Sequence, residues 1–153
     1  MKEFFIYQPM LDDLEETFRP MTEFEDIIRM HLKFGMPFPN KPKVLGEEML
    51  EFRAKFLMEE VLEFVMASMM GDIGKATDAL VDLVVVAKGT AAKMGVPWES
   101  CWDAVNIANM AKIRVDKGEG RNDFDLAKPP GWEHPDIERI VQENTYRFDP
   151  NED

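Results

Sequence analysis

Five acidic residues occur in two closely spaced groups, at spacings that suit a metal-binding site. The first group is Glu59-Glu60-x-x-Glu63, and the second is Asp78-x-x-x-Asp82. Residues three or four apart lie on one face of an α-helix, so each group would present its carboxylates together. Carboxylate oxygens are hard ligands that suit Mg²⁺, or Mn²⁺ as an alternative. If the two groups face one another, their charges repel unless a divalent cation neutralises them.

The apolar surroundings of the first group favour a metal site over a solvated acidic stripe. At about 100° per residue, Glu60 and Glu63 fall inside the apolar arc of their helix, and Glu59 lies at its edge. The members of that arc are Met49, Phe52, Phe56, Leu57 and Phe64. Carboxylates embedded among phenylalanines need a compensating partner, and a cation would provide it.

The second group lies in residues 76–87, which are otherwise apolar nearly all round. A helix of that kind is normally buried. Taken alone, Asp78 near the solvent and Asp82 paired with a lysine or arginine would explain the pattern equally well. Gly89 is on the same face and either admits another helix closely or simply packs as a small residue.

A carboxylate-bridged di-iron bundle is a rival interpretation of clustered acids. Such bundles require Glu-x-x-His pairs inside the core. The two histidines, His31 and His134, do not follow a glutamate at that spacing. The sequence therefore disfavours the di-iron site, and both histidines are interpreted as structural or surface residues.

Helix signals along the chain would place both acidic groups on neighbouring helices. Thr22 and Glu25 form a capping box, and Gly35, Gly71 and Gly95 mark helix ends. The expected helices run from Thr22 to Gly35, from about 47 to 70, from 73 to 94, from 98 to about 115, and near 135–141. We expect an all-α fold that resembles a four-helix bundle, with a domain over 22–141, an N-terminal arm over 1–21 and an acidic tail over 142–153.

Composition limits the partners of the chain. Its 153 residues carry a formal net charge of −12 and no run rich in lysine or arginine, which disfavours nucleic acid as a partner. No uncharged run approaches the roughly 18 residues of a membrane span, and the opening Met1-Lys2-Glu3 is not typical of a signal peptide. The single cysteine, Cys101, fits a reducing compartment. We expect a cytoplasmic protein without a membrane partner.

In their order along the chain, these motifs resemble the all-α nucleoside triphosphate pyrophosphohydrolase superfamily, which includes MazG. The stand-alone phosphoribosyl-ATP pyrophosphohydrolase-like proteins are the most similar group. The matching segments are Phe34-Gly35 and the proline-rich linker, Arg53 with Glu59-Glu60-x-x-Glu63, Asp78–Leu83 with Gly89-Thr90-Ala91, Asn109-Met110-x-Lys112, and Lys128-Pro129-Pro130-Gly131-Trp132.

The resemblance implies that Glu59, Glu60, Glu63 and Asp82 are metal-site residues. Members of the superfamily often have Glu-x-x-Asp in the second motif. Here Ala79 stands where that glutamate would be, and Asp78 is the expected substitute. The resemblance also implies homodimers or homotetramers. Glu59 and Glu60 are the expected catalytic residues, with Glu59 as the one that orients or deprotonates a water.

Several residues are expected at the substrate, with ordinary structural roles as alternatives. Asn109 and Lys112 resemble a phosphate-contacting pair, with Asn106 as a weaker candidate on the same helix face; Lys112 alternatively forms a solvated helix end. Lys128 and Trp132 would close over a base, unless Trp132 is an ordinary packed loop residue. Arg53 would bind phosphate or orient Glu60.

The expected function is Mg²⁺-dependent hydrolysis of a (deoxy)nucleoside triphosphate to the monophosphate and pyrophosphate, in clearance of unwanted nucleotides. Two alternatives stay open. One is hydrolysis of phosphoribosyl-ATP, and the other is a non-catalytic nucleotide-binding or interaction module, for which Ala79 and the valine-rich third helix provide the argument.

Overall fold

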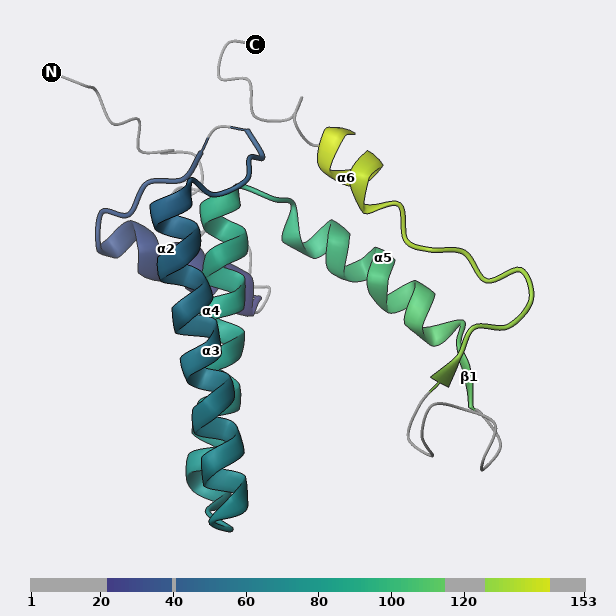
Figure 1. Cartoon of the computed structure of the whole chain (residues 1–153). Coiled ribbons are helices and arrows are strands. Elements are labelled where there is room, and N and C mark those ends of the chain that lie inside the picture. The colour runs from purple at the N-terminus through teal and green to yellow at the C-terminus, as the bar shows by residue number, and fades with distance from the viewer. Residues whose placement is uncertain (1–21, 40, 115–125, 144–153) are drawn as a thin grey trace, which may run out of the picture. The chain divides into compact units, whose positions relative to one another are not determined.

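Helices make up most of the structure, which confirms the predicted all-α class (Figure 1). The computed structural model describes residues 22–39, 41–114 and 126–143. The predicted arm over 1–21 lies outside these residues. The described chain divides into two units, one with helices α2, α3 and α4 and the other with α5, α6 and a strand pair. In the described ranges, no helix has both the length and the apolar character needed to cross a bilayer.

The first unit is built on a helical hairpin. Helices α3 (Glu47–Met69) and α4 (Ile73–Met94) lie side by side along their length, and α2 (Glu23–Lys33) packs on α4 (Figure 1). Asp72 in the connecting turn caps α4 by accepting a 3.0 Å hydrogen bond from the Lys75 backbone amide. These boundaries agree with those predicted from the glycine and capping signals.

The predicted capping box at the start of α2 is confirmed. The Glu25 amide donates to the Thr22 hydroxyl at 3.2 Å, and the Thr22 amide donates to the Glu25 carboxylate at 2.7 Å. Two backbone donors that the first helical turn would leave unpaired are thereby satisfied.

The buried stripe of α3 differs from the predicted apolar arc. Arg53, Glu60 and Ala67 are buried at seven-residue intervals, whereas Met49 and Phe52 of the arc are exposed, Phe52 by 57%. The buried residues of α4 are mostly small: Ala76, Ala79, Val86, Gly89, Ala91 and Ala92. Short side chains let two helices approach closely, so these small residues favour a close contact between α4 and its neighbours.

The second unit begins with α5 (Trp98–Met110), which is shorter than the predicted helix over 98–115. Ile113–Arg114 instead forms strand β1, which pairs antiparallel with β2 (Leu126–Ala127), so that Ile113 lies opposite Ala127. Helix α6 (Ile137–Glu143) follows and packs against α5 (Figure 1). Residues 142 and 143 of the predicted acidic tail belong to this helix, and the rest of the tail lies outside the described residues.

Candidate metal and nucleotide site

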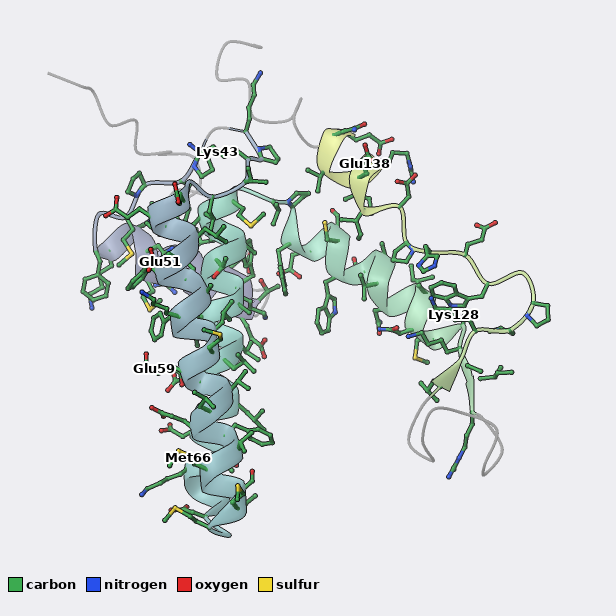
Figure 2. All side chains as sticks on the ribbon, in the orientation of Figure 1. Lys43, Glu51, Glu59, Met66, Lys128 and Glu138 are labelled. Carbon is green, nitrogen blue, oxygen red and sulfur yellow. The ribbon has the colours of Figure 1, made fainter. Side chains whose placement is uncertain are left out.

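Glu60 is the buried member of the two acidic groups. Its exposed fraction is 7%, because it lies on the stripe of α3 that includes Arg53 and Ala67. The other four, namely Glu59, Glu63, Asp78 and Asp82, are exposed; Figure 2 labels Glu59. The expected burial of both groups therefore holds for Glu60 alone. These four side chains are exposed, so their carboxylates keep access to water.

The charges of the other four acidic residues all affect the carboxyl group of Glu60. Burial raises the pKa of Glu60, and the negative charges of Glu63, Asp82, Glu59 and Asp78 raise it further. Carboxylates from α3 and α4 thus lie within electrostatic reach of a single buried carboxyl, as the spacing predicts. This cluster concentrates negative charge in a way that a bound cation would relieve.

The donor chemistry of the cluster fits Mg²⁺ or Mn²⁺. All of its ligands would be carboxylate oxygens, which these hard cations prefer. In the described part of the chain, no three side chains of the metal-binding types form a ready-made coordination set. The assignment of ligands to Glu59, Glu60, Glu63, Asp78 and Asp82 stays a prediction.

Asp78 and Ala79 differ sharply in their surroundings. Ala79 is 3% exposed on the buried side of α4, whereas Asp78, one position earlier, is exposed. Asp78 nevertheless contributes to the raised pKa of Glu60. Its charge therefore reaches the same carboxyl as that of Asp82, which is what its expected role as a substitute for a glutamate at position 79 requires.

Arg53 holds α3 to α4. Its Nη2 donates to the Val86 carbonyl at 2.8 Å, and its Nε donates to the Thr90 hydroxyl at 3.0 Å. Arg53 is 9% exposed and also lies near the Phe56 ring. These contacts give Arg53 a structural role that the sequence interpretation missed; contact with phosphate stays a prediction. The Thr90 hydroxyl, next to Gly89, is a functional contact that the sequence did not indicate, because its guanidinium partner is on another helix.

His31 is buried beside the same contact, in agreement with its interpretation as a structural residue. It is 3% exposed, its Nδ1 has no hydrogen-bond partner among the described residues, and its ring stacks on Phe38 at 5.7 Å. A Cβ at Gly89 would lie 3.3 Å from its Nε2. Of the two alternatives for Gly89, the structure favours close approach, and what the missing side chain admits are side chains of α2 and α3.

The remaining predicted substrate residues all belong to the second unit, and their approach to the carboxylates stays a prediction. Asn106, Asn109 and Lys128 are exposed, and Lys112 and Trp132 are partly buried. The Trp132 indole donates to the Ala108 carbonyl at 2.7 Å. Trp132 is thus packed against the end of α5, as the structural alternative expected, and stacking on a base stays untested.

A protein-family model described as phosphoribosyl-ATP pyrophosphohydrolase matches residues 27–109. The matched segment contains Arg53, both acidic groups and Asn109, whereas Lys112, Lys128 and Trp132 lie beyond it. A search of curated proteins finds no match for the chain.

Proposed function

The chain belongs to the phosphoribosyl-ATP pyrophosphohydrolase family, and from this premise we propose that it hydrolyses a (deoxy)nucleoside triphosphate to the monophosphate and pyrophosphate, with Mg²⁺ as cofactor. The family supports pyrophosphohydrolase activity on a nucleotide. The observation that carries the proposal is the convergence of charge from Glu59, Glu63, Asp78 and Asp82 on the buried Glu60.

The acidic residues divide into two roles in this proposal. Glu60, Glu63, Asp78 and Asp82 would hold the cation, which supplies neutralisation of phosphate charge and a lower pKa for a water molecule. Glu59 would orient or deprotonate the attacking water. Its side chain is exposed, so water can reach it. Attack on the α-phosphorus then breaks its bond to the bridging oxygen, and pyrophosphate leaves.

Cationic and amide groups after the acidic residues in the chain are the proposed contacts of the phosphate oxygens. Developing charge on transferred phosphate oxygens is stabilised by donors held in advance of the reaction. Asn109 lies in the last turn of α5, and Lys112 follows the end of that helix by two residues. We assign them to the phosphate chain, with Asn106 one turn earlier as an additional contact.

Phosphoribosyl-ATP is the second candidate substrate, and the description of the matched family favours it. Both candidates carry a triphosphate, so the same carboxylates would serve either reaction. They differ in the group attached to the base, which makes a direct comparison of rates decisive.

Exposed apolar side chains support the proposed homodimer or homotetramer. On α3, Leu62 is 61% exposed and Met66 62% exposed, and on α4 Val81 is 56% exposed. Apolar patches of this kind usually mark an interaction surface. A second copy of the chain would cover them.

Pyrophosphate release from a panel of (d)NTPs and phosphoribosyl-ATP, with and without Mg²⁺, tests the activity. Asp82→Asn should remove activity, and Asp78→Asn should lower it strongly if Asp78 serves in place of a glutamate. Asp103→Asn, on α5 outside the acidic groups, is the control and should retain it. Tight nucleotide binding without release of pyrophosphate from any substrate would favour the non-catalytic module instead.

A further inference from the structure

A network of three hydrogen bonds joins α3 to α4 in the first unit. We infer that this network fixes the register of the two helices, and that Arg53 and Thr90 are thereby positioning residues for the carboxylates of the proposed metal site. The inference rests on the proposed function, because it concerns the residues to which that function assigns the cation.

The network closes on itself. Arg53 Nη2 donates to the Val86 carbonyl at 2.8 Å, and Arg53 Nε donates to the Thr90 hydroxyl at 3.0 Å. The Thr90 hydroxyl in turn donates to the same Val86 carbonyl at 2.7 Å. A hydroxyl has a single proton, so this bond leaves its lone pairs to accept from the guanidinium. One planar fork on α3 therefore contacts two groups one turn apart on α4, which defines both a distance and a direction.

Arg53 supplies the directional contacts between the two helices. In the ranges that the structure describes, every side-chain hydrogen bond between α3 and α4 comes from Arg53, and no ion pair joins these helices. Ala67, Ala76 and Ala79 are also buried on them, but apolar contacts have no preferred direction. Short side chains interlock little, so they define the register weakly. The hydrogen bonds of Arg53 resist a shift, because the side chain is buried and breaking them would leave its donors unpaired.

The network is two helical turns from the acidic residues on both helices. Seven residues, about two turns of an α-helix, separate Arg53 from Glu60. The same step back along α4, taken from the two acceptor residues, leads to the ends of Ala79–Leu83, a segment that contains Asp82 and directly follows Asp78. The chain reverses between α3 and α4, and the helices lie side by side (Figure 1), so Glu60 comes level with this segment. The charges of Asp78 and Asp82 accordingly reach the Glu60 carboxyl.

Register matters to a bound cation because its ligand distances vary little. Mg²⁺ prefers an octahedral shell with oxygen ligands at about 2.0–2.1 Å. A slip of one helix by a single residue is a movement of about 1.5 Å along its axis, whereas a functional site tolerates about 0.5 Å. Carboxylates from two helices can therefore share one ion only while the helices stay in register.

Titration with Mn²⁺, followed by electron paramagnetic resonance, measures ion binding without turnover. Thr90→Val keeps the shape of the side chain but removes the hydroxyl, and should weaken Mn²⁺ binding about tenfold, the lower end of the loss expected when residues that orient metal ligands are changed. Thr90→Ser retains the hydroxyl and should keep the affinity of the natural sequence. Thr77→Val is the matched control on the same helix, because Thr77 also donates to the carbonyl four residues earlier but lies outside the network. It should leave the affinity unchanged.

A second control separates positioning from general stability, because a merely structural role would not change the affinity of molecules that are folded. The titration is made at a temperature at which circular dichroism shows every variant folded. Thr22→Ala removes the side-chain cap of α2 and lowers stability, but should bind Mn²⁺ as the natural sequence does. Unchanged affinity in Thr90→Val, or an equal loss in Thr22→Ala, would overturn the inference.

Arg53→Lys tests the same network from the other helix. Lysine keeps the positive charge but lacks the planar fork that reaches both acceptors, so this variant should also weaken Mn²⁺ binding. If Thr90→Val does not fold, Arg53→Lys decides, and unchanged affinity in it would remove the positioning role.

Failure of the proposed function would give a different result. Absence of hydrolysis, with Mn²⁺ binding that depends on the Thr90 hydroxyl, would overturn the activity and leave the positioning role intact. Hydrolysis by the natural sequence, with Mn²⁺ affinity that Thr90→Val leaves unchanged, would overturn only the positioning role. A natural sequence that binds no Mn²⁺ would overturn the proposed metal site and, with it, the positioning role.

Discussion

A Cβ at Gly89 would lie 2.6 Å from the Nη2 atom of Arg53, so the absence of a side chain on α4 makes room for the guanidinium of α3. That guanidinium is already fixed by its hydrogen bonds to Val86 and Thr90. His31 closes the space from α2, with its Nε2 3.3 Å from the same position. Three helices therefore meet at one glycine.

Gly89→Ala should destabilise the first unit. Alanine favours the helix by about 1 kcal/mol, but displacing Arg53 costs about 1.5–3 kcal/mol for each hydrogen bond to a charged group that is lost. The second effect is larger, and we expect a net loss of about 1–2 kcal/mol in the free energy of unfolding. Urea denaturation measures it.

Gly74→Ala is the matched control for this substitution. Gly74 is an exposed residue of α4, and its added Cβ would meet only the Asp72 carboxylate, at an ordinary 3.5 Å. The free energy of unfolding of Gly74→Ala should rise by up to about 1 kcal/mol, because alanine has a higher helix propensity than glycine. Equal gains at both positions would show that the space at Gly89 is not needed.

Glu60→Gln should raise stability and remove activity. The pKa of Glu60 is raised in the folded protein, so ionisation of this carboxyl opposes folding. The free energy of unfolding is therefore highest below the ordinary glutamate pKa and falls as the pH rises through the raised pKa of the folded state. A neutral glutamine avoids this loss at neutral pH. Thermal melting without divalent cations measures it, with Glu48→Gln, an exposed acid of α3, as control.

Mg²⁺ extends this test to the metal site. A cation that binds only the folded state raises the melting temperature. We expect that rise in the natural sequence and in Glu48→Gln, but not in Glu60→Gln. A comparable rise in Glu60→Gln would remove this residue from the site.

His31 should make folding depend on pH. Burial lowers the pKa of His31, and the positive charges of Lys93 and Arg53 lower it further. The contribution of neutral His31 to the free energy of unfolding is therefore fully present above the ordinary histidine pKa of about 6.5. It is lost as the pH falls through the lowered pKa of the folded state. One proton gives a slope of at most about 1.4 kcal/mol per pH unit.

Denaturation between pH 5 and about pH 7.5, the range around the ordinary histidine pKa, measures this slope. His31→Gln should lose the part that belongs to the histidine, while His134→Gln, which alters an exposed histidine, should keep it. A slope that survives in His31→Gln would assign it to other groups.

Met66→Glu should disrupt self-association. Met66 is a 62% exposed apolar residue of α3 (Figure 2), and a charge there would be costly to bury against a second copy. Sedimentation equilibrium should show a dimer or tetramer for the natural sequence and smaller species for the variant. Val44→Glu, at an 83% exposed residue before α3, should leave the assembly unchanged. A monomeric natural sequence would contradict the proposed oligomer.

Local signals predicted the helices well because caps and turns depend on a few neighbouring residues. The capping box of Thr22 and Glu25 and the turn at Gly71 are examples. The buried stripe of α3 was not predicted, since hydrophobicity alone would bury Phe52 and leave Arg53 exposed. Burial of Arg53 depends on the Val86 carbonyl and the space at Gly89, which are distant in the sequence.

The strand pair and the position of Trp132 were missed for a similar reason. Two-residue strands show no alternation that could identify them, and the partner of Ile113 is fourteen residues away at Ala127. In the candidate site, the spacing of the acidic residues correctly indicated that those of α3 and α4 interact electrostatically. It could not indicate that Glu60 alone would be buried, because this follows from how α3 and α4 pack.

The buried alanines of α3 and α4 would have a consequence for ion selectivity in the proposed metal site. Interhelical distance depends on the side chains at the contact, and Ala67, Ala76 and Ala79 are among the smallest available. In the proposed metal site, these methyl groups would therefore help to set the span between carboxylates on the two helices. A cation of larger radius would require wider spacing, so the alanines behind the acidic residues would limit the size of ion that the proposed site accepts.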